Sequence, residues 1–300
     1  LQPGDRLLDI GCGWGGMVRF AARRGVKALG VTLSREQAEW ARQAIADEGL
    51  GDLAEVRHSD YRDVTETGFD AISSIGLTEH IGVGNYPAYF QFLHDKLRVG
   101  GLLLNHCITR PHNRGRVKAG GFIDRYVFPD GELTGSGRII TEAQNVGFEV
   151  VHEENLRQHY AYTLAGWCEN LEKNWDACVA EVGEGTARLW GLYMAGSRLG
   201  FERNIIQLHH VLGVKLGADQ RPLAPGRKAG AAEPAPATLP AQRLLAARAT
   251  ATLGADLTQH RGPPLARGMR PPRARARHFW RAFRENFRRR FEANSCRSRT

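Results

Sequence analysis

Short runs of apolar residues alternate with longer segments of helical periodicity over residues 1–220. The apolar runs predict strands at residues 6–10, 28–32, 54–58, 69–75, 101–108, 148–156 and 204–214. The helical segments predict helices at residues 14–24, 35–48, 86–97, 139–146, 163–181 and 184–200. Ser34 precedes the second helix and Gln37 follows three positions on, which is the pattern of a capping box. This alternation favours an α/β fold in which helices cover both faces of a parallel sheet.

The composition of the chain changes at about residue 218. We expect residues 1–218 to form one domain, since residues 1–220 carry five more acidic than basic side chains, whereas residues 221–300 carry fourteen more basic than acidic ones. Alanine, arginine and proline dominate residues 219–300. Such a tail buries too little apolar surface to offset the entropy of ordering, so we expect it to be mostly disordered.

One segment of this tail has a different pattern. Over residues 277–292 a phenylalanine recurs every four positions between arginines, as in a basic amphipathic helix suited to an anionic membrane or nucleic acid. The alternative is that the tail comes from shifted or read-through translation and has no selected role.

Cysteine usage and the length of the apolar runs limit the environment of the protein. Five cysteines fit neither a metal cluster nor an even set of disulfides, so we expect reduced thiols and no metal site. His209 and His210 suggest a metal site only superficially, because neighbours on a strand point to opposite faces. No apolar run approaches the roughly 20 residues of a membrane span, and no signal peptide opens the chain. We expect a cytoplasmic protein, peripheral to the inner face of the membrane.

The stretch LLDIGCGWGG at residues 7–16 places a tight turn directly after the first predicted strand. Gly11, Gly13 and Gly15 permit such a turn and a close approach of the backbone to a ligand. A dinucleotide site would have the spacing G-x-G-x-x-G and an acidic residue about 20 positions later. Here the spacing is G-x-G-x-G, the second strand ends without an acid, and Asp9 precedes the loop instead.

A carboxylate beside a glycine loop suits S-adenosylmethionine, whose sulfonium and ammonium groups are cationic. Asp60, Tyr61 and Arg62 follow the third predicted strand, where a polar or aromatic cluster could flank an adenine ring. A glycine loop alone is weak support. A dinucleotide site and a purely structural turn therefore stay open as alternatives at this point.

Further motifs resemble the cyclopropane fatty acid synthase and mycolic acid cyclopropane synthase family. They run in order from about residue 1 to residue 217: DIGCGWGG, GVTLSREQ at 30–37, SDYRD at 59–63, SIGLTEHIGVGNYPAYF at 74–90, LLLNHCITRP at 102–111, RYVFPDGEL at 125–133 and NLRQHYAYTLAGW at 155–167. The resemblance implies a Rossmann-like class I methyltransferase with a seven-stranded, mostly parallel sheet. It also implies transfer of a methyl group from S-adenosylmethionine to a cis double bond in a lipid acyl chain.

The resemblance implies two sets of site residues. Thr32, Leu33 and Gln37 would border the ribose and adenosine, and Tyr61 and Arg62 the adenine. Together with the loop, the candidate cofactor-binding residues are Asp9, Gly11, Cys12, Gly13, Gly15, Thr32, Leu33, Gln37, Asp60, Tyr61 and Arg62. The candidate catalytic residues match the family positions that hold a bicarbonate ion, which are Glu79, His106, Tyr160 and the backbone of Ile108.

Each catalytic candidate also has an ordinary structural interpretation. Glu79 could cap a turn, His106 could be a hydrogen-bonded core histidine, and Tyr160 could be a core aromatic residue. The implied chemistry is consistent with the catalytic interpretation, because methyl transfer to an alkene leaves a cation that water would destroy. The site must therefore be apolar and closed, with a base that is not itself alkylated, and bicarbonate can take the proton as the ring closes.

The implied partner is a membrane phospholipid or another unsaturated acyl lipid, with peripheral membrane contact; a homodimer is open, and nucleic acid is not expected. Family members carry a helical N-terminal segment over the cofactor, and this chain begins after it, so we expect weak or absent turnover. Ser197 stands where many relatives have a cysteine. Two alternatives stay open: a family enzyme that makes a methyl-branched, methylene-branched or hydroxylated lipid, and a non-catalytic lipid- or nucleic-acid-binding remnant.

Overall fold

The computed structural model describes residues 1–114, 117–118, 121–128 and 131–217. The proposed tail and its amphipathic segment at 277–292 lie outside these residues. The described chain divides into two compact units. Of the described residues, the first contains Leu1–Val117, Glu132–Asn155 and residues 208–217, and the second contains those of Lys118–Gly131 and Leu156–Gln207.

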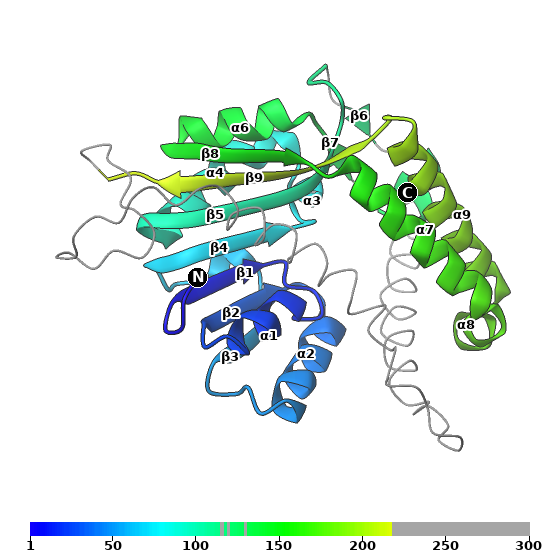
Figure 1. Cartoon of the computed structure of the whole chain (residues 1–300), viewed down its shortest axis with the longest axis horizontal. Helices are drawn as coiled ribbons and strands as arrows, with labels where there is room; N and C mark the ends of the chain where they lie inside the picture. The colour runs from blue at the N-terminus through cyan, green and yellow to red at the C-terminus, as the bar shows by residue number, and fades with distance from the viewer. Residues whose placement is uncertain (115–116, 119–120, 129–130, 218–300) are drawn as a thin grey trace, which may run out of the picture. The chain divides into compact units, whose positions relative to one another are not determined.

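A seven-stranded sheet forms the centre of the first unit, in the order β3-β2-β1-β4-β5-β9-β8 (Figure 1). β1 pairs in parallel with β2 and β4, and β2 with β3 and β4 with β5 also pair in parallel, whereas β8 and β9 are antiparallel. The strands are β1 Arg6–Ile10, β2 Lys27–Thr32, β3 Ala54–His58, β4 Phe69–Ile75, β5 Leu97–Thr109, β8 Phe148–Asn155 and β9 Gln207–Lys215. Because the strand order reverses between β1 and β4, ligands are expected beyond the carboxyl ends of these two strands.

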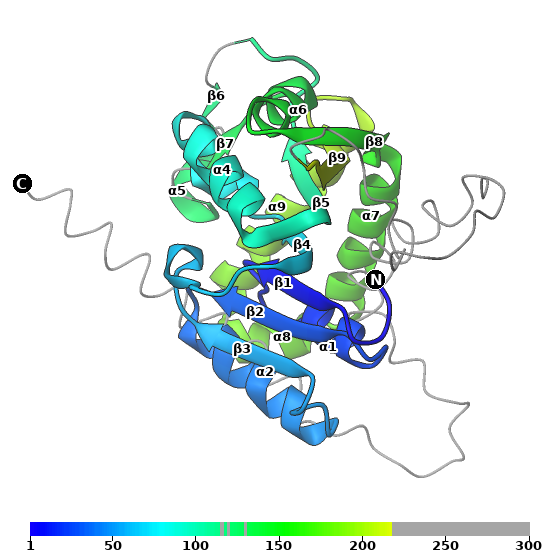
Figure 2. The same ribbon diagram turned by 90° about the vertical axis from the view of Figure 1, so that its left-hand side faces the viewer.

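Alternating side chains of the strands form two apolar clusters, one on each face of the sheet. Leu8 and Phe90 belong to the cluster that includes residues of α4 and α6, and Leu7 and Val18 to the cluster that includes residues of α1 and α2. Figure 2 shows the ribbon of these strands and helices from a second side. The helices of this unit are α1 Gly16–Ala22, α2 Arg35–Asp47, α3 Thr78–Ile81, α4 Tyr86–Lys96 and α6 Ser136–Asn145. Phe90 is fully buried, and burial of such a side chain contributes about 1.5–3 kcal/mol.

Several short elements were not predicted from periodicity, because each is only two to six residues long. They are the 3₁₀ helices η1 Tyr61–Asp63 and η2 Val83–Asn85, the helices α3 and α5, and the strands β6 Val117–Lys118 and β7 Glu132–Leu133. The last predicted strand also begins later than expected, at Gln207, since Asn204 before it has a φ of 57° and interrupts an extended chain.

The second unit is helical, with α5 Gly121–Tyr126, α7 Arg157–Lys173, α8 Trp175–Val182 and α9 Glu184–Glu202. The prediction of one helix over residues 163–181 is wrong, because α7 ends and α8 begins at Asn174. Asn174 has φ −115° and ψ 25°, and its Nδ2 donates to the carbonyl of Asn170 at 2.8 Å. A short amide side chain that bonds to the backbone in this way favours a helix end. Among the described helices, none is long and apolar enough to cross a membrane.

Candidate functional site

The glycine loop connects β1 to α1 with three residues in the left-handed region. Gly11, Gly13 and Gly15 have φ values of 73°, 55° and 72°. The amides of Gly11 and Cys12 donate to the carbonyl of Val31 at 2.9 and 3.0 Å, which fixes the loop to the end of β2. The loop therefore lies where β1 and β2 end, at the edge of the sheet where ligands bind.

The three glycines differ in what surrounds them. A Cβ on Gly11 would lie 3.2 Å from the side chain of Leu77, and a Cβ on Gly15 would lie 3.0 Å from that of Ala41. A Cβ on Gly13 would meet nothing closer than the Nε2 atom of Gln37 at 4.0 Å. Gly11 and Gly15 are thus required for packing as well as for φ, whereas the backbone of Gly13 is open to a ligand.

Asp9 is a buried carboxylate on β1, directly opposite Ser73 of β4. Ser73 Oγ donates to Asp9 Oδ1 at 2.6 Å. Burial raises the pKa of Asp9 to about 6, although the Ser73 hydrogen bond favours the ionised form. Burial and the Asp9 charge also raise the pKa of the Cys12 thiol, so this cysteine is an inert neutral side chain.

The end of β2 carries the second group of cofactor candidates. Thr32 Oγ1 donates to Gln37 Oε1 at 3.0 Å, and Leu33 exposes 71% of its surface. Ser34 Oγ accepts the Gln37 amide at 3.2 Å as a cap, but the Ser34 amide donates to Thr32 Oγ1 at 3.3 Å. The predicted capping box is therefore only half formed, because Thr32 takes the place of the Gln37 side chain.

Asp60, Tyr61 and Arg62 lie after β3. The Asp60 carboxylate accepts from the Arg62 amide at 2.9 Å and from the guanidinium Nη2 at 2.7 Å, and this pairing lowers the pKa of Asp60. Tyr61 packs edge-on against Tyr89 and Phe92 of α4, with ring centroids 5.3 and 5.1 Å apart. Tyr61 thus has a packing role in the apolar cluster beside its predicted cofactor contact.

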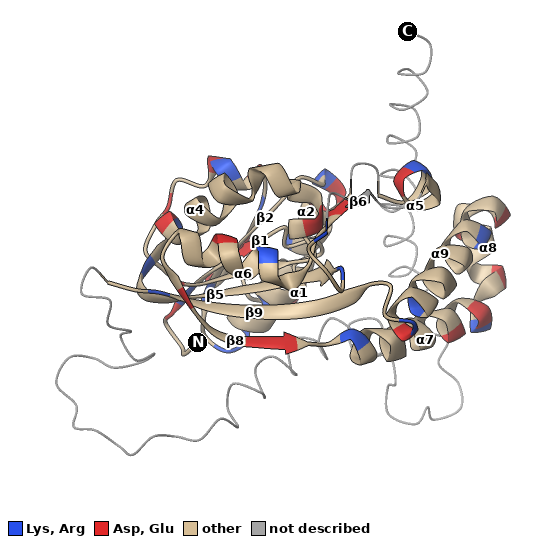
Figure 3. Cartoon of the chain, turned by 90° about the horizontal axis from the view of Figure 1, so that it is seen from above, with Lys and Arg blue, Asp and Glu red and all other residues tan. Residues whose placement is uncertain are grey.

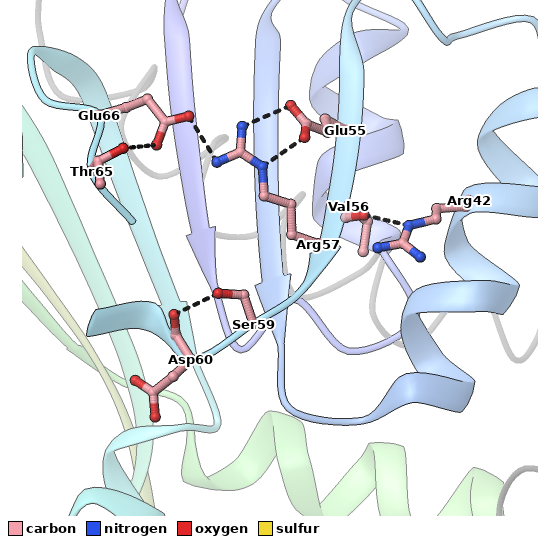
Figure 4. A network of polar contacts seen from close by, with 8 residues as sticks. All are labelled: Arg42, Glu55, Val56, Arg57, Ser59, Asp60, Thr65 and Glu66. Carbon is pink, nitrogen blue, oxygen red and sulfur yellow. Dashed lines mark hydrogen bonds and ion pairs between the residues drawn. The ribbon is translucent and has the colours of Figure 1, made fainter. Parts of the chain in front are cut away.

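Arg57 of β3 contacts Glu55, which precedes the Asp60–Arg62 segment, and Glu66, which follows it (Figure 4). Its Nε donates to Glu55 Oε1 at 2.6 Å, and its Nη1 lies 2.7 Å from Glu66 Oε1. The same view shows Ser59 Oγ bonded to the Asp60 carbonyl, at 3.0 Å. These contacts restrain the loop between β3 and β4.

Glu79 is a buried carboxylate on the four-residue helix α3, which follows β4. Its Oε1 accepts from the amide of Ile108 on β5 at 2.7 Å, and its buried Oε2 has no hydrogen-bond partner among the described residues. Burial raises the pKa of Glu79 to about 7. The structure therefore brings Glu79 and Ile108 together and leaves one carboxyl oxygen for a further donor.

His106 lies on β5, opposite Ile75 of β4 in the register. Burial, with a smaller effect of the neighbouring His210, lowers the pKa of His106 to about 3, so the ring is neutral at physiological pH. In the described part of the chain, neither ring nitrogen of His106 takes part in a hydrogen bond. This imidazole is free to donate to or accept from a ligand.

Tyr160 lies on α7, in the second unit. Its ring packs edge-on against Phe201 and Trp167, with centroids 4.9 and 5.9 Å apart. Its role beside Glu79 and His106 stays a prediction.

Sequence reasoning did not single out Ser73 or His210 as partners of the candidate residues. Ser73 contacts Asp9 because β1 and β4 are adjacent in register, and His210 contacts His106 from β9. Both contacts depend on strand pairing, which periodicity does not reveal. Alternation did indicate that His209 and His210 face opposite sides, and their partners differ: His209 bonds Thr109.

The strand order, the glycine turn at the switch point and the acidic residues at the carboxyl ends of the strands together define a Rossmann-like class I methyltransferase fold. Within that class, residues 1–211 match the family described as mycolic acid cyclopropane synthetase, and the chain belongs to this family.

Individual relatives agree with this assignment. The chain is 71% identical over 228 residues to a probable fatty acid methyltransferase of Mycobacterium tuberculosis, covering 75% of this chain and 53% of the relative. It is 48% identical over 224 residues to a probable fatty acid methyltransferase of Pseudomonas putida, covering 73% and 57%. A crystal structure of a mycolic acid cyclopropane synthase complexed with SAH and CTAB superposes with a TM-score of 0.66 at 31% identity, covering 72% of this chain and 79% of that one. The chain thus spans about half the length of the curated relatives it matches.

Proposed function

We propose that this chain is the methyltransferase part of an enzyme of the cyclopropane-fatty-acyl-phospholipid synthase type. It transfers a methyl(ene) group from S-adenosylmethionine to a cis double bond of a lipid acyl chain. The observation that carries the proposal is the buried carboxyl of Glu79, which is bonded through one oxygen to the Ile108 amide on β5, the strand that also carries the neutral His106 two residues earlier. The family and the SAH and CTAB complex of a relative support the cofactor and the lipid class.

The residues around the glycine loop fit S-adenosylmethionine. The open backbone at Gly13 admits the methionine part, and Thr32 with Gln37 offers hydroxyl and amide groups to the ribose. Asp9 is buried with a pKa of about 6, so a nearby cation would favour its ionised form. S-Adenosylmethionine supplies an electrophilic methyl group; Asp9 offsets its positive charge, and the loop holds it against the strand ends.

The residues beyond β4 and β5 fit bicarbonate. Glu79 Oε2 is buried and needs a hydrogen-bond donor, which the hydroxyl of bicarbonate provides. With a pKa of about 7, Glu79 can also hold a proton itself and so avoid repelling an anion. Bicarbonate would supply a base that is not itself alkylated; His106 would hydrogen-bond it and Glu79 would orient it.

The test uses vesicles of monounsaturated phospholipid, methyl-labelled S-adenosylmethionine and the chain in excess over lipid, so that slow transfer is detected. Mass spectrometry of the acyl chains should show one added labelled CH₂, loss of the double bond and dependence on bicarbonate. Glu79→Gln should abolish ring formation while cofactor binding is retained. Binding of the cofactor without any transfer of label would refute the proposal and favour a binding remnant.

A second product class has its own support. Two relatives, at 71% and 48% identity, are named probable fatty acid methyltransferases. In this case the cation loses a different proton and leaves a methyl or methylene branch. Both products gain one labelled CH₂ and have the same mass, so the acyl chains are also treated with ozone, which cleaves the double bond of a branched alkene and leaves a cyclopropane ring intact.

A further inference from the structure

His106 belongs to a larger group of titratable side chains that extends across three neighbouring strands. The ring centroids of His106 on β5 and His210 on β9 are 4.5 Å apart. Glu154 of β8 lies directly opposite His210 in the antiparallel register, and its Oε2 is 3.8 Å from His152 Nε2. The group therefore leads from the proposed base site to the outer strand of the sheet.

The two inner histidines of this group are buried, and its outer members on β8 are partly exposed. His106 and His210 expose only 8% and 2% of their surface, whereas the side chains of His152 and Glu154 expose 24% and 35%. β8 is the terminal strand of the seven-stranded sheet, and it carries the acidic residues Glu149, Glu153 and Glu154; acidic positions are red in Figure 3. A proton that reaches Glu154 is therefore in contact with solvent.

His209 and His210 differ in whether their ring nitrogens have hydrogen-bonding or ionic partners. His209 Nδ1 bonds Thr109 Oγ1 at 2.7 Å, and its Nε2 lies 3.3 Å from Glu153 Oε1. His210 Nδ1 is buried and makes no hydrogen bond to any residue that the structure describes. An imidazole with an uncommitted nitrogen can bind a proton there and release the proton of its other nitrogen, whereas both nitrogens of His209 are occupied.

The lowered pKa values of His106 and His210 favour passing a proton on over holding it. Burial lowers the pKa of His106 to about 3 and that of His210 to about 4. The charged groups that face His210 act in opposite directions, since Glu154 favours its protonated form and His152 opposes it. Neither buried ring retains a proton at neutral pH, and the carboxylate at the surface attracts it.

We propose that His210 is a positioning residue that relays the proton released at His106 to Glu154 at the edge of the sheet. This inference rests on the proposed function, in which each turnover removes one proton from the substrate. The bare ring nitrogen of His106 takes the substrate proton from the bicarbonate that accepted it, which regenerates bicarbonate, and His106 releases the proton of its other nitrogen to His210. The ring of His210 takes this proton on one nitrogen and gives the proton of its other nitrogen to the carboxylate of Glu154, which passes it to water. The steps move protons only, so no oxidant or reductant is needed.

The test compares His210→Gln with the matched control His209→Gln. Gln keeps a polar side chain but cannot bind and release a proton in this way. His210→Gln should lower kcat by about tenfold or more, leave the KM for S-adenosylmethionine unchanged and regain rate when imidazole is added to the buffer. His209→Gln should show no rescue by imidazole. A His210→Gln enzyme with the wild-type kcat, or with a loss that imidazole does not restore, would overturn the relay.

A second readout does not depend on turnover. The exchange of the His106 ring N–H with water, followed by nitrogen-15 NMR, should be at least about tenfold slower in His210→Gln than in His209→Gln or the wild type. Equal exchange rates in the three proteins would refute the relay even if methyl transfer is observed. Slower exchange in a chain that transfers no label would instead support the relay and count against the proposed function.

Discussion

Replacement of Glu79 by Gln should make the stability of this protein less dependent on pH. Glu79 is buried with a pKa of about 7, raised from an ordinary value of 4.5. The folded state therefore holds a proton on this group that the unfolded state releases between these two values. The resulting stability is fully present below pH 4.5 and is lost as the pH rises through 7.

The size of the effect follows from these two pKa values. Relative to strongly acidic conditions, ionisation of Glu79 costs about 1 kcal/mol of stability at pH 5 and about 3 kcal/mol at pH 8. Gln is neutral throughout, and its Oε1 can still accept from the amide of Ile108. The free energy of unfolding of Glu79→Gln relative to the wild type should therefore rise by about 2–3 kcal/mol between pH 5 and pH 8.

Urea unfolding followed by circular dichroism at pH 5, 6, 7 and 8 measures this difference. At a typical urea m-value of about 1–3 kcal/mol/M, the gap between the two midpoints should change by roughly 1–2 M over this range. Glu149→Gln, at an exposed position of β8, is the control and should change stability by less than about 0.5 kcal/mol at each pH. A constant difference between Glu79→Gln and the wild type across the range would refute the reasoning.

Three further predictions follow from the glycine loop and its surroundings. Asp9→Asn should weaken S-adenosylmethionine binding by roughly tenfold or more at pH 8. The affinity of the wild type should increase from pH 5 to pH 7, because Asp9 ionises with a pKa of about 6. Calorimetric titration measures both effects. Gly15→Ala should lower the free energy of unfolding by about 1–3 kcal/mol, because residue 15 has a φ of 72° and the new methyl group would lie 3.0 Å from the Cβ of Ala41. Thermal unfolding measures this loss, which should be smaller for the control Gly49→Ala, where the new methyl group meets open space. Alkylation at pH 8 followed by mass spectrometry should label the partly buried Cys168 well before Cys12, whose pKa burial and Asp9 raise.

Periodicity predicted the sheet well, because its strands are apolar runs separated by turn residues. The elements that it missed or misplaced depend on single residues or on tertiary contacts. Asn174 divides a helix that periodicity predicted as continuous, since its side chain bonds to the preceding turn. Helix α3 is too short for any periodic signal, and hydrogen bonds from elsewhere support it, such as that from Asn105 Nδ2 to Thr78 Oγ1 at 2.6 Å.

The sequence predicted the positions of the candidate site residues but not their protonation states. Glycine spacing predicted the loop, and the family motifs predicted Glu79, which lies on α3 after β4, and His106, which lies near the end of β5. The protonation states were not predictable, because they depend on burial and on neighbours from other strands, such as Ser73 beside Asp9 and His210 beside His106. The hydrogen bond from Ile108 to Glu79 likewise required the structure, since 29 residues separate the two partners.

The two buried acids themselves argue that this end of the sheet is selected for binding. Asp9 and Glu79 both have pKa values raised by burial, so each lowers the stability of the folded state at neutral pH. Asn and Gln would accept the hydrogen bonds from Ser73 and Ile108 without this cost. A carboxylate is preferable there only if its charge or its proton is used, as it is in the function proposed above, with a cationic cofactor at Asp9 and bicarbonate at Glu79. Substitutions that stabilise the chain at pH 8 are therefore expected to be the same ones that remove its ligands.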